Sequence, residues 1–315
     1  MKALTNIKPF TLHNELKKKF KPMFPKERLY HYTTVDPFLK LMDKEGRFYC
    51  TYFRALNDDK EFWEGVDYVF EYLKKWGKIT EGRCQKLRAE VSKAEAMKGN
   101  LPWIMSFSLE RDSLQQWMSY TDKKSGGYAI GYNFKRLESA VEALVKVKRD
   151  KAELSSDGGI PYALYFLPCF YLDRGDSKAM KNIDRFIKYM FTTFFNKVSK
   201  KDALKKRDQG ALLWSQIMLI SSLIKNPTFK GENEFRLVMM SCSGDIKDRV
   251  EFVGGKPRLK VPLDTVVAPL NKLVDEVVIS PHGDTVALRC VAEFSMLKSG
   301  RKFDISASRS SFNGR

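Results

Sequence analysis

Two glutamates separated by a single residue stand where a polar segment runs into a hydrophobic one. They are Glu232 and Glu234, in the sequence Gly-Glu-Asn-Glu-Phe-Arg at 231–236. We predict a strand beginning at this segment, and in a strand alternate side chains point to the same face. Two carboxylates on one face repel each other, so the pair indicates either a site that uses the charge or an exposed sheet edge. In a site, paired carboxylates serve acid–base catalysis and stabilise developing positive charge.

A histidine and two serines lie in two other segments that have the pattern of short strands. His31 is the centre of Leu-Tyr-His-Tyr-Thr at 29–33, and Ser106 and Ser108 flank Phe107 in a second hydrophobic run. Alternation places both serines on one face of their strand. Taken alone, a histidine of this kind is more often a hydrogen-bonded structural residue than a ligand-binding one. His31 becomes a site residue only if the fold brings it beside the serines and the glutamates.

A cluster of acidic residues precedes a predicted helix. Asp58, Asp59 and Glu61 lie in Leu-Asn-Asp-Asp-Lys-Glu-Phe at 56–62, and Asp58 with Glu61 has the spacing of a capping box. Helix capping explains these residues without any function. The functional alternative is a metal-dependent nuclease in which these three acids and Glu234 would hold a divalent cation.

The remaining composition predicts no metal centre, no disulfide and no membrane segment. The three histidines are far apart, and the five cysteines are scattered, so we expect buried free thiols in a reducing compartment. No apolar run reaches the ~18 residues that cross a bilayer. The N-terminal sequence has no hydrophobic signal segment. We therefore expect a cytoplasmic protein without a membrane partner.

The charge balance predicts an anionic partner. The chain has 56 Lys and Arg against 38 Asp and Glu, a formal net charge of +18. Such an excess attracts phosphate-rich molecules, and counterion release adds salt-dependent affinity. A solvated helix face explains any single basic cluster. For the whole excess we expect nucleic acid, RNA or DNA, with a phosphorylated small molecule as the alternative. The expected nucleic-acid-binding residues are Lys200, Lys201, Lys205, Lys206 and Arg207.

Hydrophobic periodicity predicts the elements that must position these side chains. Helices are expected over about 58–76, with a less regular continuation to about 97, over 113–120, and over most of 177–225. Strands are expected at 28–33, 47–54, 102–107, 128–134, 162–171, 234–241, 274–279 and 286–290. The apolar phase of these elements predicts the following core residues: Phe62, Val66, Phe70, Leu73, Trp103, Ile130 and Phe235.

These elements define an α+β fold with a mixed or antiparallel sheet at its core. We expect a basic N-terminal helical extension over 1–27 and a single domain over 28–305. A helical insertion falls at about 177–225. The serine-rich tail over 306–315 is expected to fray.

Taken in order, the segments resemble a large bacterial family that is known mainly as a domain of unknown function. The shared pattern is Tyr-His-Tyr-Thr, Leu-Asn-Asp-x-x-Glu-Phe, Ser-Phe-Ser, Gly-Gly-Tyr-Ala-Ile-Gly-Tyr and Glu-x-Glu-Phe-Arg, and it covers roughly residues 28–310. Members of this family are regarded as toxin-like or phage-defence effectors. The resemblance implies such a role here, with an antitoxin or a defence-system protein as a candidate partner.

The same segments are more loosely similar to the ADP-ribosyltransferase superfamily, and this resemblance implies a sheet core of the ADP-ribosyltransferase type. Its members hold NAD with a His or Arg on the first strand, a strand bearing serines or a tyrosine, and a terminal Glu-x-Glu. The resemblance implies that His31 fixes a ribose of NAD and that Ser106 and Ser108 form the serine strand. It implies that Glu234 is the catalytic glutamate and Glu232 the auxiliary one.

Two features depart from that superfamily pattern. Phe107 stands where the serine strand has a central Thr, and the helical stretch before Glu232 is longer than a compact transferase needs. The resemblance also leaves two candidates, Tyr49 and Tyr52, for the tyrosine that stacks on nicotinamide.

The function expected from the residues and the resemblance is an NAD-dependent ADP-ribosyltransferase that modifies nucleic acid. NAD is then a substrate, and no metal is required. Cleavage of the nicotinamide–ribose bond passes through an oxocarbenium-like transition state, which a carboxylate stabilises. Two alternatives stay open. One is a non-catalytic nucleic-acid-binding or sensor module, and the other is the metal-dependent nuclease described above.

Overall fold

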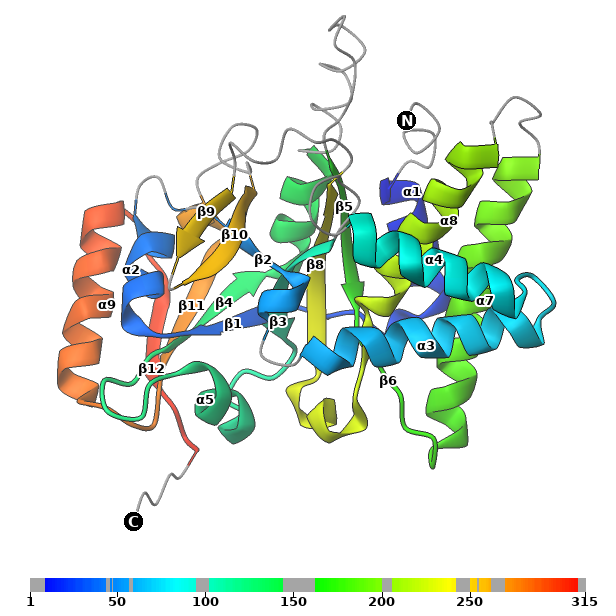
Figure 1. Cartoon of the computed structure of the whole chain (residues 1–315). Coiled ribbons are helices and arrows are strands. Elements are labelled where there is room, and N and C mark those ends of the chain that lie inside the picture. Colours follow the sequence, from blue (N-terminus) through cyan, green and yellow to red (C-terminus); the bar gives the residue numbers. More distant parts are fainter. Residues whose placement is uncertain are drawn as a thin grey trace, which may run out of the picture.

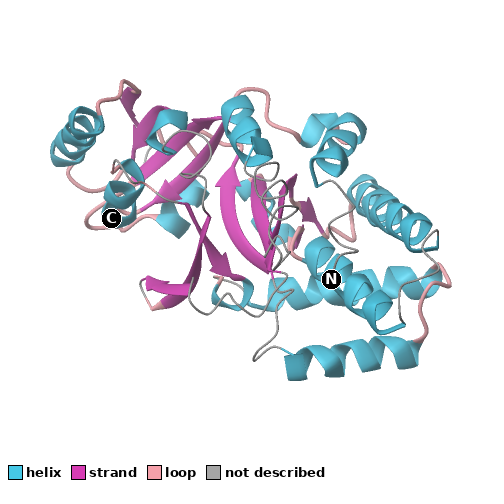
Figure 2. Cartoon of the chain, turned by 90° about the horizontal axis from the view of Figure 1, so that it is seen from above, coloured by secondary structure: helices cyan, strands magenta, loops and turns pink. Residues whose placement is uncertain are grey.

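A ten-stranded sheet forms the centre of the molecule in the computed structural model, with helices at both ends (Figures 1 and 2). Helices α2 and α9 lie at one end, and α3, α4, α7 and α8 lie at the other (Figure 1). The structure describes residues 9–43, 46, 48–56, 59–94, 102–143, 162–199, 206–241, 250–253, 255–261 and 270–310. The α+β class with a mixed, mainly antiparallel sheet is confirmed.

The sheet has an unbranched run of eight strands and a side branch of two. The run has the order β12-β11-β4-β1-β3-β2-β10-β9, while β8 pairs with β3 and β5 pairs with β8. The strands are β1 (Arg28–Thr33), β2 (Phe48–Tyr52), β3 (Pro102–Ser108), β4 (Tyr128–Asn133), β5 (Tyr162–Pro168), β8 (Glu234–Ser241), β9 (Val250–Val253), β10 (Lys256–Val261), β11 (Val274–Ile279) and β12 (Asp304–Ala307). Two short strands, β6 (Phe170–Tyr171) and β7 (Ile224–Lys225), pair with each other in parallel.

The helices lie mostly where periodicity predicts them. They are α1 (Pro9–Lys19), α2 (Val35–Met42), α3 (Asp59–Lys75), α4 (Glu81–Ala94), α5 (Leu114–Tyr120), α7 (Ser177–Ser199), α8 (Lys206–Ser221) and α9 (Thr285–Ser299). The short 3-10 helices are η2 (Lys21–Met23), η3 (Phe53–Ala55), η4 (Pro227–Glu232) and η7 (Leu270–Leu273). Helices α7 and α8 occupy the stretch expected to be a helical insertion.

Strand β3 joins the parts of the sheet. It pairs antiparallel with β8 along its whole length, with Ser106 opposite Arg236. Its other edge is shared, because Ser108 pairs with β1 and Ile104 pairs with β2. Strands β1 and β2 therefore part from β3 at different points. The backbone of Ser106 lies between those points.

The two faces of β3 and β8 differ in chemistry because side chains alternate along each strand. Phe107 and Phe235 are opposite each other, and both contact Phe166 of β5, with ring centroids 5.8 and 4.8 Å away. This face belongs to the hydrophobic core. The residue that precedes each phenylalanine, Ser106 on β3 and Glu234 on β8, points to the other face. The core residues predicted from periodicity are all buried: Phe62, Val66, Phe70, Leu73, Trp103, Ile130 and Phe235.

The N-terminal segment, expected as an extension outside the domain, packs on the sheet. Leu16 of α1 is buried, and the His13 ring bonds to the Phe166 carbonyl of β5 at 2.8 Å. The amphipathic spacing of α1 explains this, because its apolar side chains need a partner surface.

Residues 306–310, expected to fray, are held in place. Ser306 and Ala307 end β12, which pairs in parallel with β11. The Asp112 carboxylate then accepts hydrogen bonds from the hydroxyls of Ser308 and Ser310 at 2.5 and 3.0 Å. The serine-rich composition indicated a frayed tail, but two of these serine hydroxyls donate hydrogen bonds to the half-buried Asp112 carboxylate, which orders the segment. Residues 311–315 lie outside the described part of the chain.

The expected strand at 286–290 is wrong, because this segment is the first part of α9. Asp284 caps the helix, and its carboxylate accepts from the backbone N–H groups of Val286 and Ala287 at 2.9 and 3.1 Å. Gly300 ends the helix in the left-handed conformation, with φ of 67°. A short apolar run does not distinguish strand from helix. Cys290 is consequently exposed on this helix, against the expectation of a buried thiol.

Phe70 is 2% exposed on α3, so we expect its truncation to reduce the stability of the protein strongly. Phe70→Ala should lower the free energy of unfolding by about 3–5 kcal/mol because it leaves a cavity. Phe294→Ala is the matched control, since Phe294 is 70% exposed on α9. Denaturant titrations of both variants measure the difference. Equal stability of the two variants would contradict the packing described here.

Candidate active site

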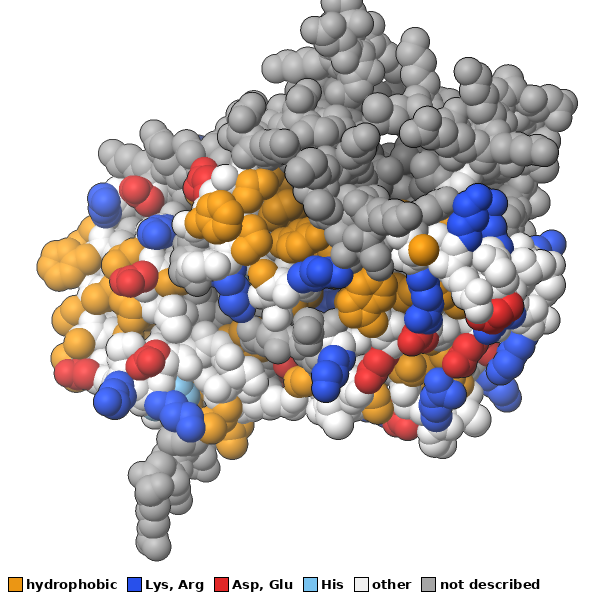
Figure 3. Space-filling view, viewed as in Figure 1, with side chains coloured by type: hydrophobic (Ala, Val, Ile, Leu, Met, Phe, Trp, Pro, Cys, Tyr) orange, Lys and Arg blue, Asp and Glu red, His pale blue; other side chains and the backbone are white. Residues whose placement is uncertain are grey.

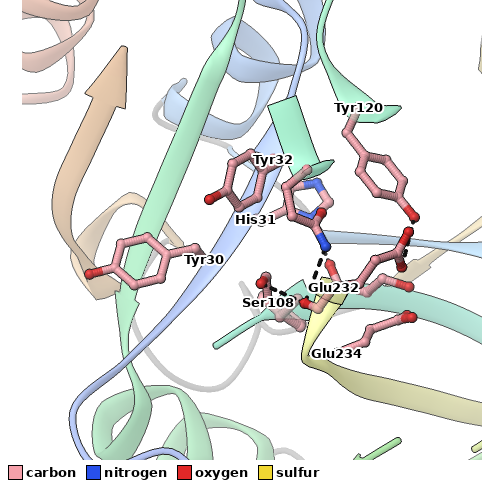
Figure 4. A pocket seen from close by; sticks show the side chains of 10 residues that line it. Tyr30, His31, Tyr32, Ser108, Tyr120, Glu232 and Glu234 are labelled. Atoms are coloured by element: carbon pink, nitrogen blue, oxygen red, sulfur yellow. Dashed lines mark hydrogen bonds between the residues drawn. The ribbon is translucent and has the colours of Figure 1, made fainter. Parts of the chain in front are cut away.

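The histidine, the two serines and the two glutamates singled out from the sequence come together in one small pocket. His31 of β1, Ser106 and Ser108 of β3, Glu232 of η4 and Glu234 of β8 all line a cavity of about 40 Å³ (Figure 4). We call this the inner pocket. Its other lining residues are Tyr30, Tyr32, Phe107, Gln116 and Tyr120. Residues as far apart in the sequence as His31 and Glu234 therefore converge, as the combined sequence pattern requires.

A larger cavity of about 540 Å³ adjoins the inner pocket and shares five of its residues. We call it the wide cleft. The shared residues are His31, Tyr32, Ser106, Tyr120 and Glu232. Strands β2 and β10 contribute further wall residues, among them Tyr49, Thr51, Lys256 and Arg258. This volume lies within the range of small-molecule sites in proteins.

Glu232 is placed by a turn rather than by a strand, which corrects the expected geometry of the glutamate pair. It ends η4, and Asn233 then adopts the left-handed conformation with φ of 43°. The Ser108 hydroxyl and the Gln116 side-chain amide donate to the Glu232 carbonyl at 2.7 and 3.2 Å (Figure 4). Asn tolerates this conformation better than most residues. The turn, and not strand alternation, brings Glu232 beside Glu234.

Five charged side chains form a buried cluster at the base of the site. We call Glu61, Lys225, Glu232, Glu234 and Arg236 the charge cluster; each side chain is 7% exposed or less. Lys225 Nζ binds Glu232 at 2.8 Å and also binds Glu234. Arg236 binds Glu234 at 2.7 Å through Nε and Glu61 at 2.7 Å through a terminal nitrogen. Three carboxylates against two cations leave one carboxylate in excess.

The cluster moves the pKa values of the two paired glutamates in opposite directions. Burial raises the pKa of Glu234, but Arg236 and Lys225 outweigh burial and hold that pKa at about 2. Burial raises the pKa of Glu232, the neighbouring Glu234 carboxylate raises it further, and Lys225 offsets these effects only in part. Glu234 is therefore a fixed anion at neutral pH, while Glu232 takes up a proton more readily than an ordinary glutamate.

His31 is held as a neutral imidazole with one nitrogen directed at a backbone carbonyl. Its Nδ1 lies 2.9 Å from the Ser106 carbonyl oxygen. A carbonyl only accepts hydrogen bonds, so Nδ1 carries the proton and Nε2 is left as an acceptor. Burial lowers the pKa of His31, which keeps the ring neutral. A neutral acceptor nitrogen in the wall of both cavities suits a ligand hydroxyl.

The two candidate stacking tyrosines differ in position. Tyr49 lines the wide cleft, and its hydroxyl donates to Glu251 at 3.0 Å. Tyr52 instead packs on Phe53 and Trp103, with ring centroids 4.8 and 5.2 Å away, and does not line either cavity.

Sequence reasoning missed two residues of the site, Tyr120 and Lys225. The Tyr120 hydroxyl lies 3.5 Å from a carboxylate oxygen of Glu232, and burial raises the pKa of that hydroxyl (Figure 4). Tyr120 follows Trp117 on the predicted helix 113–120, so its type and position were visible. Lys225 gave no such signal, because only the fold places it between the glutamates.

The expected nucleic-acid-binding segment cannot be placed. Lys200, Lys201 and Lys205 lie outside the described residues, as do the side chains of Lys206 and Arg207. On the face shown in Figure 3, basic side chains are spread over the described surface, and over the helical end they alternate with acidic ones. Searches limited to the described ranges find no helix able to cross a membrane and no group of three or more His, Cys, Asp or Glu able to hold a metal. Asp58 lies outside those ranges, and the side chain of Asp59 is not described.

Comparison with known proteins gives a family of unknown function. Residues 116–237 match the sequence model of the family described as protein of unknown function (DUF2971). The matched segment includes Tyr120, Lys225, Glu232, Glu234 and Arg236. No curated protein and no solved structure is significantly similar to the chain. The expected resemblance to a family of unknown function is thus confirmed over this segment, and the resemblance to ADP-ribosyltransferases stays a hypothesis.

The charge cluster predicts that Glu234→Gln destabilises the protein. Removing one partner of a buried ion pair costs about 3–5 kcal/mol. The folded-state pKa of about 2 lies below the unfolded value of about 4.3, so the stabilisation is present above the unfolded pKa. It is lost as the pH falls through about 2. Unfolding free energies of wild type and Glu234→Gln should therefore converge between about pH 5 and pH 2.

Glu293→Gln is the control for this experiment, because Glu293 is exposed on α9. It should match wild type at every pH. A Glu234→Gln protein as stable as wild type at neutral pH would show that Glu234 is not held by Arg236 and Lys225.

Proposed function

We propose that the protein binds NAD in the wide cleft and cleaves its nicotinamide–ribose bond, transferring ADP-ribose to an acceptor. The observation that carries this proposal is the convergence of His31 with Glu232 and Glu234. The pKa of Glu232 lies above that of an ordinary glutamate, and the pKa of Glu234 lies below it. Two carboxylates with divergent pKa values characterise acid–base sites. The toxin or defence role implied by the family resemblance belongs to the same proposal.

The two glutamates are assigned different roles on electrostatic grounds. Glu234 stays ionised, and the charge cluster contains one carboxylate more than its two cations when all are charged. This negative excess favours the positive charge that develops on the ribose during bond cleavage. Glu232 lines both cavities and has the raised pKa, so it accepts the proton that the incoming nucleophile gives up.

The other cleft residues are assigned to binding. His31 offers Nε2 to a ribose hydroxyl, and the Ser106 side chain lies beside it in both cavities. Tyr49 and Tyr120 supply aromatic rings, of which Tyr120 is nearest to Glu232. The Ser108 hydroxyl is already engaged with the Glu232 carbonyl, so it serves to position Glu232.

Substitution of Glu232 tests the catalytic assignment. Glu232→Gln should lower turnover of NAD by about 10²-fold or more, because an amide cannot accept the proton. Its stability should change little, since burial already disfavours the charge of Glu232. His31→Ala should chiefly raise KM. Release of nicotinamide, measured by chromatography with and without added RNA or DNA, gives both parameters, and Glu293→Gln is the control.

Absence of nicotinamide release by the wild-type protein with any acceptor would contradict the proposal. Full turnover by Glu232→Gln would contradict the role of Glu232 as the base.

The acceptor is proposed to be nucleic acid because of the net charge of +18. Affinity for RNA or DNA should then fall log-linearly with salt, as counterions are released. Neutralising Lys200, Lys201, Lys205 and Lys206 together should weaken binding and flatten the slope, as measured by fluorescence anisotropy. Absence of binding at low salt would turn the proposal towards a protein or small-molecule acceptor.

A further inference from the structure

A half-buried cationic side chain in the wide cleft, that of Arg258, lacks a carboxylate partner among the described residues. Arg258 of β10 lies opposite Thr51 of β2, and both line the cleft. Its Nε is shielded from solvent and has no hydrogen-bond partner. Within the described ranges, Arg258 forms no ion pair. Glu251, directly opposite on β9, accepts a hydrogen bond from Tyr49 instead.

Arg258 differs in this respect from the two cations of the charge cluster, which also line the cleft. Lys225 and Arg236 are each bound by two or more carboxylates of the charge cluster. Burial lowers the pKa of Arg258, and the neighbouring Tyr49 offsets that effect only in part. A half-buried guanidinium without a partner is costly, and that cost is recovered when a ligand supplies the anion.

The chemistry of the missing partner follows from the guanidinium and from its surroundings. Arginine binds phosphate oxygens through two parallel N–H donors. Lys40 and Lys256 line the same cleft and add positive charge. The walls also carry the aromatic rings of Tyr49 and Phe229. The volume of about 540 Å³ is that of a small-molecule site, which favours a phosphorylated small molecule over a nucleic-acid strand.

We propose that Arg258 binds the diphosphate of a nucleoside diphosphate group. Arg258 is on β10, and β2 lies between β10 and β3, the strand that carries Ser106. Two strand spacings, about 10 Å, therefore separate β10 from β3. A ribose and its diphosphate can span that separation. The argument for an anion site depends on the unpartnered Arg258 guanidinium. It rests on the proposed function only for the identification of the ligand as NAD.

Calorimetric titration with ADP and with adenosine tests this assignment. Wild-type protein should bind ADP, and Arg258→Gln should weaken ADP binding by about tenfold or more while leaving adenosine unaffected. Arg258→Lys should recover part of the affinity, because it restores the charge without the two parallel donors. Arg83→Gln is the matched control, since Arg83 is exposed on α4 and does not line the cleft.

The melting temperature provides a second readout. Arg258→Gln should melt at or above the wild-type temperature, because it removes an unpaired charge. A lower melting temperature would show that the guanidinium stabilises the fold, and it would overturn the proposal. Unchanged ADP affinity in Arg258→Gln would also overturn it. So would failure of wild type to bind ADP at millimolar concentration, or binding of a single-stranded oligonucleotide in place of ADP.

These outcomes are separable from those of the proposed function. If Arg258→Gln loses ADP binding and the wild-type protein does not cleave NAD, the anion site is supported and the transferase proposal is contradicted. Cleavage of NAD with equal ADP affinity in both proteins leaves the transferase and removes the anion site.

Discussion

The site depends on the charge cluster, in which two cations hold three carboxylates away from solvent. Lys225 and Arg236 connect α3 to the consecutive elements β7, η4 and β8, and Arg236 lies 175 residues after its partner Glu61. Isolated charges at these positions would be prohibitively costly, and each is tolerated only because the others are present. Burial, together with the neighbouring Glu234 carboxylate, makes the charge of Glu232 the unfavourable one. The pair of divergent pKa values is thus a consequence of how the helices dock on the sheet.

The sheet supplies the frame on which the cluster is built. Alternation on β3 and β8 places aromatic side chains in the core and polar ones on the opposite face. The divergence of β1 and β2 from β3 exposes the Ser106 carbonyl, and His31 satisfies it. A backbone group left unpaired by strand geometry thereby fixes the tautomer of the histidine. The hydrogen bond between His31 and Ser106 therefore both stabilises the fold and orients the histidine in the site.

Sequence patterns predicted the parts of this arrangement that depend on local periodicity. Val66, Phe70 and Leu73 recur at helical spacing, and the structure buries all three. Patterns failed where a local signal was ambiguous, as at 286–290, where the Asp284 cap decides for helix. They also failed where partners are distant, since nothing near Arg236 in the sequence indicates Glu61. Glu232 lies beside Glu234 as expected, but a left-handed Asn233 and not a strand positions it.

The central proposal is that His31 and Glu232 contact the ribose of NAD in the wide cleft, with the Glu234 carboxylate beside them in the charge cluster. A crystal structure of the wild-type protein with a non-cleavable carbocyclic NAD analogue tests it most directly. The account predicts the nicotinamide-side sugar within hydrogen-bond distance of His31 Nε2 and the Glu232 carboxylate. An analogue that binds elsewhere on the molecule, or a cleft that stays empty at saturating concentration, would contradict it.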